Sequence, residues 1–129
     1  MKIKIIAMLS FTLLMSSPLT ALARDLGADM DILAASSSTV LKSDNVDVVK
    51  KALADMHDAA LDARQATPAK LKGEPADSAK MKDFRQGMTH LIGQIEQAQA
   101  LAAKGDLQQV KAVAKQFKQT RDENHAKFR

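Results

Sequence analysis

The feature that most constrains the fold is a set of four apolar stripes, in which hydrophobic residues recur at alternating steps of three and four. The stripes cover residues 26–40, 46–60, 81–102 and 107–128. This spacing keeps apolar side chains on one face of an α-helix and is typical of helices that pack together in bundles. The cleanest stripe consists of Met81, Phe84, Met88, Leu91, Ile95, Ala98 and Ala102. The pattern therefore predicts an all-α fold built from four helices.

Helix-capping and turn-forming residues lie between the stripes. Ser43, Asp44 and Asn45 provide caps between the first and second helices. The Gly105-Asp106 pair separates the third from the fourth, and Gln109 completes a capping-box pattern. A longer Pro- and Gly-containing connection precedes the third helix, with Asp77 or Ser78 as its cap. Because the two outer connections are short, we expect an antiparallel up-down-up-down four-helix bundle.

The first 23 residues have the pattern of a cleaved secretory signal. Lys2 and Lys4 precede an apolar stretch at residues 5–15, and Ala21-Leu22-Ala23 gives the small-x-small pattern that a signal peptidase needs. The apolar stretch is too short for a membrane anchor. We therefore expect a signal peptide at residues 1–23 and one mature domain at 24–129. This domain is expected in the bacterial periplasm, with no membrane association after cleavage.

The charge balance argues against a nucleic-acid partner. The full chain has a formal charge of +4. Both lysines of the predicted signal are lost on cleavage, so the mature domain has 17 basic and 15 acidic residues and a charge of +2. Export and a nearly balanced charge are both unfavourable for a nucleic-acid-binding function.

The chain contains no cysteine. Disulfides, cysteinyl zinc sites, iron–sulfur clusters and thiol nucleophiles are thereby excluded. The Cys-x-x-Cys-His pattern that attaches haem covalently is excluded as well. Any haem in this protein must be held non-covalently.

Met30 and His125 are the candidate ligands for such a group. Met30 lies about 9 Å along the first helix and His125 about 6 Å from the end of the last, at a rise of about 1.5 Å per residue. If these helices are antiparallel neighbours, both side chains lie at one end of the bundle. A thioether and an imidazole can bind a haem iron from opposite faces. The alternative, a core methionine and a solvated histidine that favours the helix dipole, remains open.

Other chemistry lacks the required residue patterns. His57 and His90 have no histidine at the three- or four-residue spacing of a metal pair. No glutamate lies three residues before a histidine, as a di-iron carboxylate bundle requires. No Gly-x-Ser-x-Gly nucleophile motif occurs either. We therefore do not expect an enzyme.

Four segments carry a family resemblance, namely residues 59–63, 82–85, 93–95 and 120–129. Through them, the predicted mature chain resembles the cytochrome b562 family over residues 24–129 without gaps. The resemblance implies an up-down-up-down bundle that binds one non-covalent b-type haem per chain. It also implies that Met30 and His125 are the axial ligands.

The resemblance assigns further residues to the haem pocket. Arg121 corresponds to an arginine beside the haem, and its four-residue spacing to His125 and Arg129 suits contacts with the propionates. This chain departs from the family pattern at Ala69, Met88 and Asn124. The expected pocket residues beyond the two ligands are Leu33, Pro68, Phe84, Met88, Arg121 and Arg129.

We therefore predict a monomeric periplasmic electron carrier that makes transient contacts with unidentified periplasmic redox proteins. A six-coordinate Met/His iron passes single electrons but leaves no open position for oxygen or a substrate. The alternative is a haem-free periplasmic helical adaptor or chaperone-like protein that uses exposed helix faces.

Overall fold

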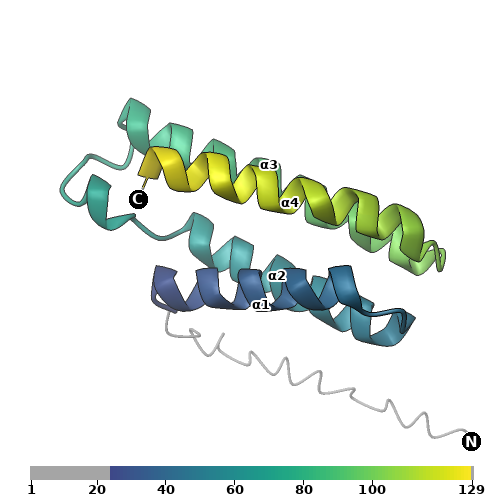
Figure 1. Ribbon diagram of the computed structural model, residues 1–129. Coiled ribbons are helices and arrows are strands. Elements are labelled where there is room, and N and C mark those ends of the chain that lie inside the picture. The colour runs from purple at the N-terminus through teal and green to yellow at the C-terminus, as the bar shows by residue number, and fades with distance from the viewer. Residues whose placement is uncertain (1–23, 129) are drawn as a thin grey trace, which may run out of the picture.

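The computed structural model describes residues 24–128, which form four α-helices (Figure 1). The predicted signal segment at residues 1–23 and Arg129 lie outside the described residues. No strand occurs among residues 24–128, so the all-α prediction is confirmed. The helices are α1 (Leu26–Lys42), α2 (Val46–Arg64), α3 (Ala79–Ala103) and α4 (Leu107–Phe128), with a short 3-10 helix, η1 (Ala69–Leu71), between α2 and α3.

The helices begin at the residues that the sequence marks as caps. The Asn45 side chain accepts hydrogen bonds from the backbone N–H groups of Asp47 and Val48 at the start of α2. The Ser78 hydroxyl accepts one from Met81 at the start of α3. These bonds satisfy amide groups that have no partner inside the first turn of a helix. The predicted capping by Asn45 and Ser78 is confirmed.

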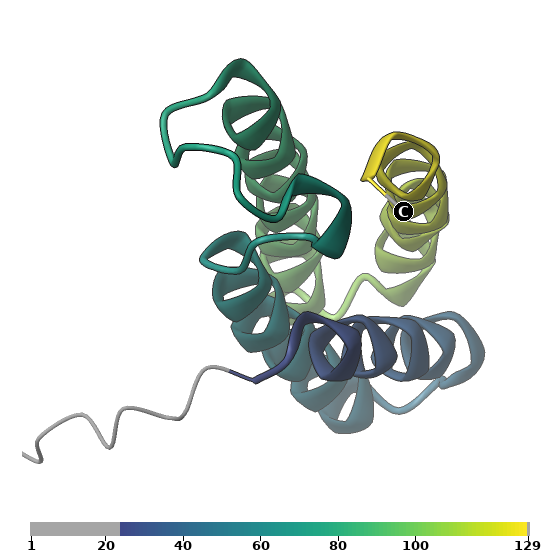
Figure 2. The ribbon, with the colours of Figure 1, turned by 90° about the vertical axis from the view of Figure 1, so that its left-hand side faces the viewer.

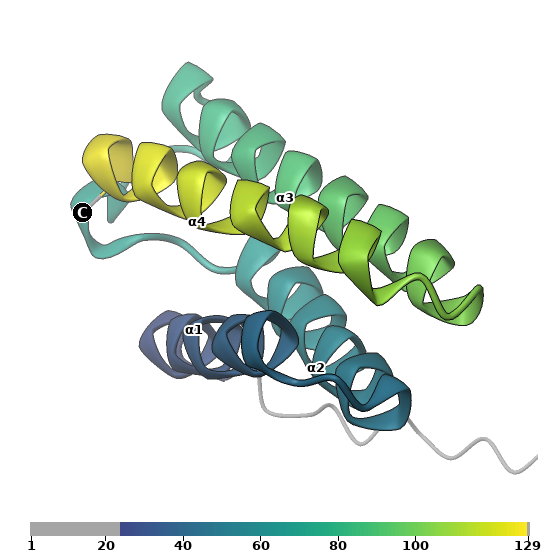
Figure 3. The same ribbon diagram turned by 45° about the vertical axis from the view of Figure 1, so that its right-hand side comes forward.

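Consecutive helices run antiparallel and pack extensively against each other, whereas α1 and α4 make far fewer contacts. Figure 2 shows the molecule from the end where α1 begins, and Figure 3 shows α3 and α4 side by side along their lengths. The predicted up-down-up-down bundle is therefore confirmed. The start of α1, the end of α4 and the connection between α2 and α3 all lie at the same end of the molecule (Figure 1).

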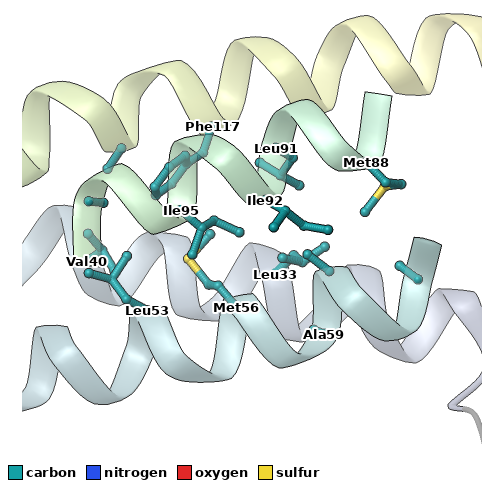
Figure 4. Close-up of a cluster of buried hydrophobic side chains, with 14 of the residues drawn as sticks. Leu33, Val40, Leu53, Met56, Ala59, Met88, Leu91, Ile92, Ile95 and Phe117 are labelled. Atoms are coloured by element: carbon teal, nitrogen blue, oxygen red, sulfur yellow. The ribbon is translucent and has the colours of Figure 1, made fainter. Parts of the chain in front are cut away.

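The core is formed by side chains from all four helices (Figure 4). Every residue of the third stripe, from Met81 to Ala102, is buried. Val40, Leu53 and Ile95 have no exposed surface. Burying a side chain of this size stabilises the fold by about 1.5–3 kcal/mol. The core therefore joins all four helices into one bundle.

No helix within residues 24–128 combines the length and the hydropathy that a membrane crossing requires.

Candidate functional site

A cavity of about 790 Å³ opens between α1 and α4 at the end of the bundle where the α2–α3 connection lies. Pockets of about 300–1,000 Å³ are typical of sites for small molecules and cofactors. Residues from all four helices and from residues 66–70 line the cavity. The sparse contact between α1 and α4 leaves room for it.

Met30 and His125 both line this cavity. Met30 lies in the second turn of α1 and His125 in the last turn of α4, and both residues are partly buried. Each side chain can therefore contact a ligand in the cavity, although 95 positions separate the two in the sequence. The expectation that both residues lie at one end of the bundle agrees with this placement.

Apolar side chains form the inner wall of the cavity. Leu33 extends from α1, Phe84 and Met88 extend from α3, and all three are buried. Pro68 closes the wall from the α2–α3 connection and is also buried. Such a wall favours an apolar ligand and excludes water from its buried edge.

Charged side chains surround the mouth of the cavity. Lys70, Lys118 and Arg121 line it together with Asp25 and Asp31. The Arg121 side chain is 37% exposed, and its guanidinium lies 3.5 Å from the Asp122 carboxylate. This rim can bind anionic groups of a ligand whose apolar body lies deeper in the cavity.

The cavity brings together seven of the eight residues expected from the sequence. The eighth, Arg129, lies outside the described residues. The expected set lacked other residues of the wall, among them Leu91 and Phe117. Both belong to the predicted apolar stripes, so the stripe pattern marks them as buried but does not show that they face a cavity.

His57 and His90 lie outside the cavity. The His57 imidazole lies 3.2 Å from the Glu96 carboxylate, and the exposed His90 ring contacts the Gln94 amide. His57 is therefore a boundary residue and His90 a surface residue.

An acidic pair beside Met30, with one residue fully buried and the other partly buried, was not predicted. Asp29 is fully buried, and its Oδ1 accepts a hydrogen bond from Arg24 Nε at 2.9 Å. One oxygen of Asp29 and one of Asp62 are buried with no hydrogen-bond partner. Burial, reinforced by the neighbouring Asp62, raises the pKa of Asp29 to about 6 despite the opposing effect of Arg24. Asp29 lies three residues after Leu26 and four before Leu33, so its spacing alone could have placed it on the buried face.

The donor groups of this site suit a haem better than a bare metal ion. Within the described residues, no group of three or more His, Cys, Asp or Glu side chains could hold a metal ion. The cavity instead offers one thioether, one imidazole, apolar walls and a basic rim. These features fit an iron porphyrin with two axial ligands and exposed propionates. The residues present therefore fit this cofactor.

The comparisons with known proteins agree with this chemistry. The family model for cytochrome b562 matches residues 25–129. Over 125 residues, the chain is 42% identical to "Probable soluble cytochrome b562 2" of Yersinia pestis, covering 97% of both chains. It is 38% identical over 128 residues to "Probable soluble cytochrome b562 1" of the same organism, covering 99% of this chain and 98% of the relative. The chain therefore belongs to the cytochrome b562 family, whose members are haem-binding electron carriers.

Proposed function

We propose that this protein is a periplasmic electron carrier that binds one b-type haem non-covalently, with Met30 and His125 as its axial ligands. The observation that supports this most strongly is that both side chains line one apolar cavity, from helices at opposite ends of the domain sequence. Membership of the cytochrome b562 family supports the choice of cofactor.

When bound, the haem iron supplies a one-electron ferric/ferrous couple. The Met30 thioether and the His125 imidazole would both hold the iron, and this would leave no position for oxygen or a substrate. Methionine ligation raises the reduction potential of a haem iron. The ligand pair therefore favours electron transfer over catalysis.

The remaining residues of the cavity hold and shield the cofactor. Leu33, Phe84 and Met88 exclude water from the apolar macrocycle, because all three are buried against the core. Arg121 and Lys118 lie at the mouth, where they would pair with the propionates.

The charged mouth is also where a redox partner would dock. Electron-transfer complexes are small and short-lived, and complementary charge orients them without strong binding. We propose that the protein works as a monomer that meets periplasmic redox proteins at this edge.

A haem-free adaptor would need an exposed apolar surface for its partner. Among the described residues, Val48 is the only large hydrophobic side chain that is well exposed. Isolated exposed apolar residues are normal in soluble proteins. No feature of the described surface therefore favours this alternative.

The proposal is tested by titrating the haem-free protein with haem and recording the absorption spectrum. Met30→Ala and His125→Ala remove the two ligands, while Met81→Leu and His90→Ala change a methionine and a histidine that do not line the cavity. We expect wild type and both controls to bind one equivalent with a low-spin, six-coordinate spectrum. The ligand variants should show high-spin iron, and a wild-type protein that binds no haem would refute the function.

A further inference from the structure

Two neighbouring stripes occupy the last turns of α4. Thr120, Asn124 and Phe128, at four-residue spacing, all contact α3. Arg121 and His125 each follow one of these residues and line the cavity, whose lining also includes Asn124 and Phe128. Successive residues of an α-helix are rotated by about 100° at 3.6 residues per turn. The way the first stripe sits on α3 therefore sets the direction of the second.

The contact between α3 and α4 leaves no room for a side chain at Gly87. A Cβ atom on this glycine would overlap Asn124 Oδ1 and would lie 2.9 Å from both Asn124 Cγ and Nδ2. These separations are shorter than any non-bonded contact that carbon tolerates. The Asn124 amide thus occupies the space that a side chain at position 87 would need. Glycine is unfavourable in a helix interior, so the close contact explains its presence there.

Contacts on both sides of Asn124 keep the two helices in register. One turn earlier, Thr120 Oγ1 donates a hydrogen bond to Gln94 Oε1 at 2.9 Å. One turn later, the rings of Phe128 and Phe84 meet edge-on with their centres 5.5 Å apart. Asn124 therefore lies in the middle of a continuous α3–α4 seam.

We propose that Asn124 is a positioning residue for His125. Its amide, seated on the Gly87 backbone, fixes the rotation of the last two turns of α4. This rotation fixes the direction from which the His125 imidazole enters the cavity. The inference rests on the proposed role of His125 as a haem ligand, and Asn124 itself needs no bond to the iron.

A double-mutant cycle tests the proposal on the haem-loaded protein. Gly87→Ala places a methyl group where the Asn124 amide lies, Asn124→Ala removes the amide, and the double variant has neither clash nor amide. Gly93→Ala is the matched control, because nothing lies within 4 Å of a Cβ at that position of the same helix. The readouts are the haem dissociation constant, the midpoint potential and the electron paramagnetic resonance spectrum of the ferric protein.

We expect Gly87→Ala to raise the haem dissociation constant about tenfold, as is typical when a residue that orients a metal ligand is disturbed. Its resonance spectrum should shift, because the imidazole is rotated about the iron. Asn124→Ala alone should also weaken haem binding and shift the spectrum, because it leaves the space beside Gly87 empty. In the double variant the new methyl group at position 87 fills that space in place of the amide, so most of the affinity should return, whereas Gly93→Ala should match wild type. These results together would support the inference.

Equal affinities and spectra for Gly87→Ala and Gly93→Ala would overturn it, as would a double variant no better than Gly87→Ala. If Gly87→Ala does not fold, the Asn124→Ala variant tests the inference by itself, because this substitution adds no atoms. An electron paramagnetic resonance spectrum of Asn124→Ala that equals that of wild type would overturn the inference. Failure of the proposed function is distinguishable, since wild type would then bind no haem. Normal His125-dependent binding with no effect in the cycle refutes only the role of Asn124.

Discussion

Replacing Asp29 by asparagine is expected to stabilise the haem-free protein at neutral pH. Asp29 is fully buried, and one of its oxygens has no hydrogen-bond partner. The other oxygen accepts a bond from Arg24, whose side chain is 38% exposed. The Asp62 carboxylate neighbours the Asp29 carboxylate. Burial and this second carboxylate together raise the pKa of Asp29 to about 6. The ionised form of Asp29 is therefore poorly accommodated in the folded state.

The sign of the pH dependence follows from the pKa of Asp29 in the folded and unfolded states. The pKa of Asp29 is higher in the folded state than the ordinary value of 3.8, so folding favours the protonated form. This contribution to the unfolding free energy is fully present below the pKa that Asp29 has in the unfolded state. It is lost as the pH rises through the pKa that Asp29 has in the folded state. A tenfold change in an acid dissociation constant corresponds to about 1.4 kcal/mol, so the loss of stability reaches about 3 kcal/mol above pH 6.

Asparagine keeps an oxygen for Arg24 and adds an amide that can donate to Asp62. The ion pair that it removes contributes little, because Arg24 is partly exposed. The Asp29→Asn variant should therefore gain about 1–3 kcal/mol at pH 7 and lose the decline in stability between pH 4 and pH 6.

Urea unfolding of the haem-free protein at pH 4, 5, 6 and 7 measures both effects. Asp31→Asn is the control, because it removes an exposed acid from the same part of α1. The difference in unfolding free energy between Asp29→Asn and wild type should grow with pH, while the control difference stays flat. An Asp29→Asn variant that is less stable than wild type at pH 7, with the same pH profile, would show that the ionised Asp29 does not destabilise the folded state.

Three further predictions concern the folding of the bundle and are checked by urea unfolding. Asn45→Ala should lower the unfolding free energy by about 1 kcal/mol through loss of the α2 cap. Gly105→Ala should be destabilising by about 1 kcal/mol, because the φ angle of Gly105 is +77°. Gly93→Ala should instead be stabilising by about 0.5–1 kcal/mol, because a Cβ atom at position 93 would meet open space. Leu53→Ala should cost about 2–5 kcal/mol and leave the haem spectrum unchanged, because Leu53 does not line the cavity. A neutral Asn45→Ala, equal effects at the two glycines, or an altered haem spectrum in Leu53→Ala would contradict these expectations.

The core could be predicted from the sequence because its signal is local and repeated. The stripe from Met81 to Ala102 is apolar at every seam position, and each of these residues is buried. The first helix gives a weaker signal. Asp29 and Met30 both lie three or four residues from Leu26 and from Leu33, so the apolar spacing does not distinguish them. Only the packing shows that Asp29 is the more deeply buried.

The cavity could not be predicted from periodicity alone. It depends on the sparse contact of α1 with α4 and on residues 66–70 of the α2–α3 connection. Likewise, the sequence shows a glycine at position 87 within a helix but does not identify Asn124 as its neighbour. Such contacts arise from helix crossing and register, which apolar spacing does not determine.

The departures from the family pattern have clear locations in the fold. Met88 is buried in the inner wall of the cavity, where a flexible thioether chain can fill irregular space. Ala69 is exposed and begins η1 at the cavity edge. Asn124 contacts the backbone of Gly87. None of these three departures from the family pattern replaces a proposed haem ligand.

The most direct test of Met30 as a haem ligand is redox potentiometry of the haem-loaded protein, combined with reduced-minus-oxidised difference spectra, for wild type and Met30→Ala. We expect one haem per chain, a low-spin ferrous spectrum in wild type, and a lower midpoint potential with high-spin iron in the variant, because the thioether raises the potential. Identical spectra and potentials in the two proteins would show that Met30 is not a ligand.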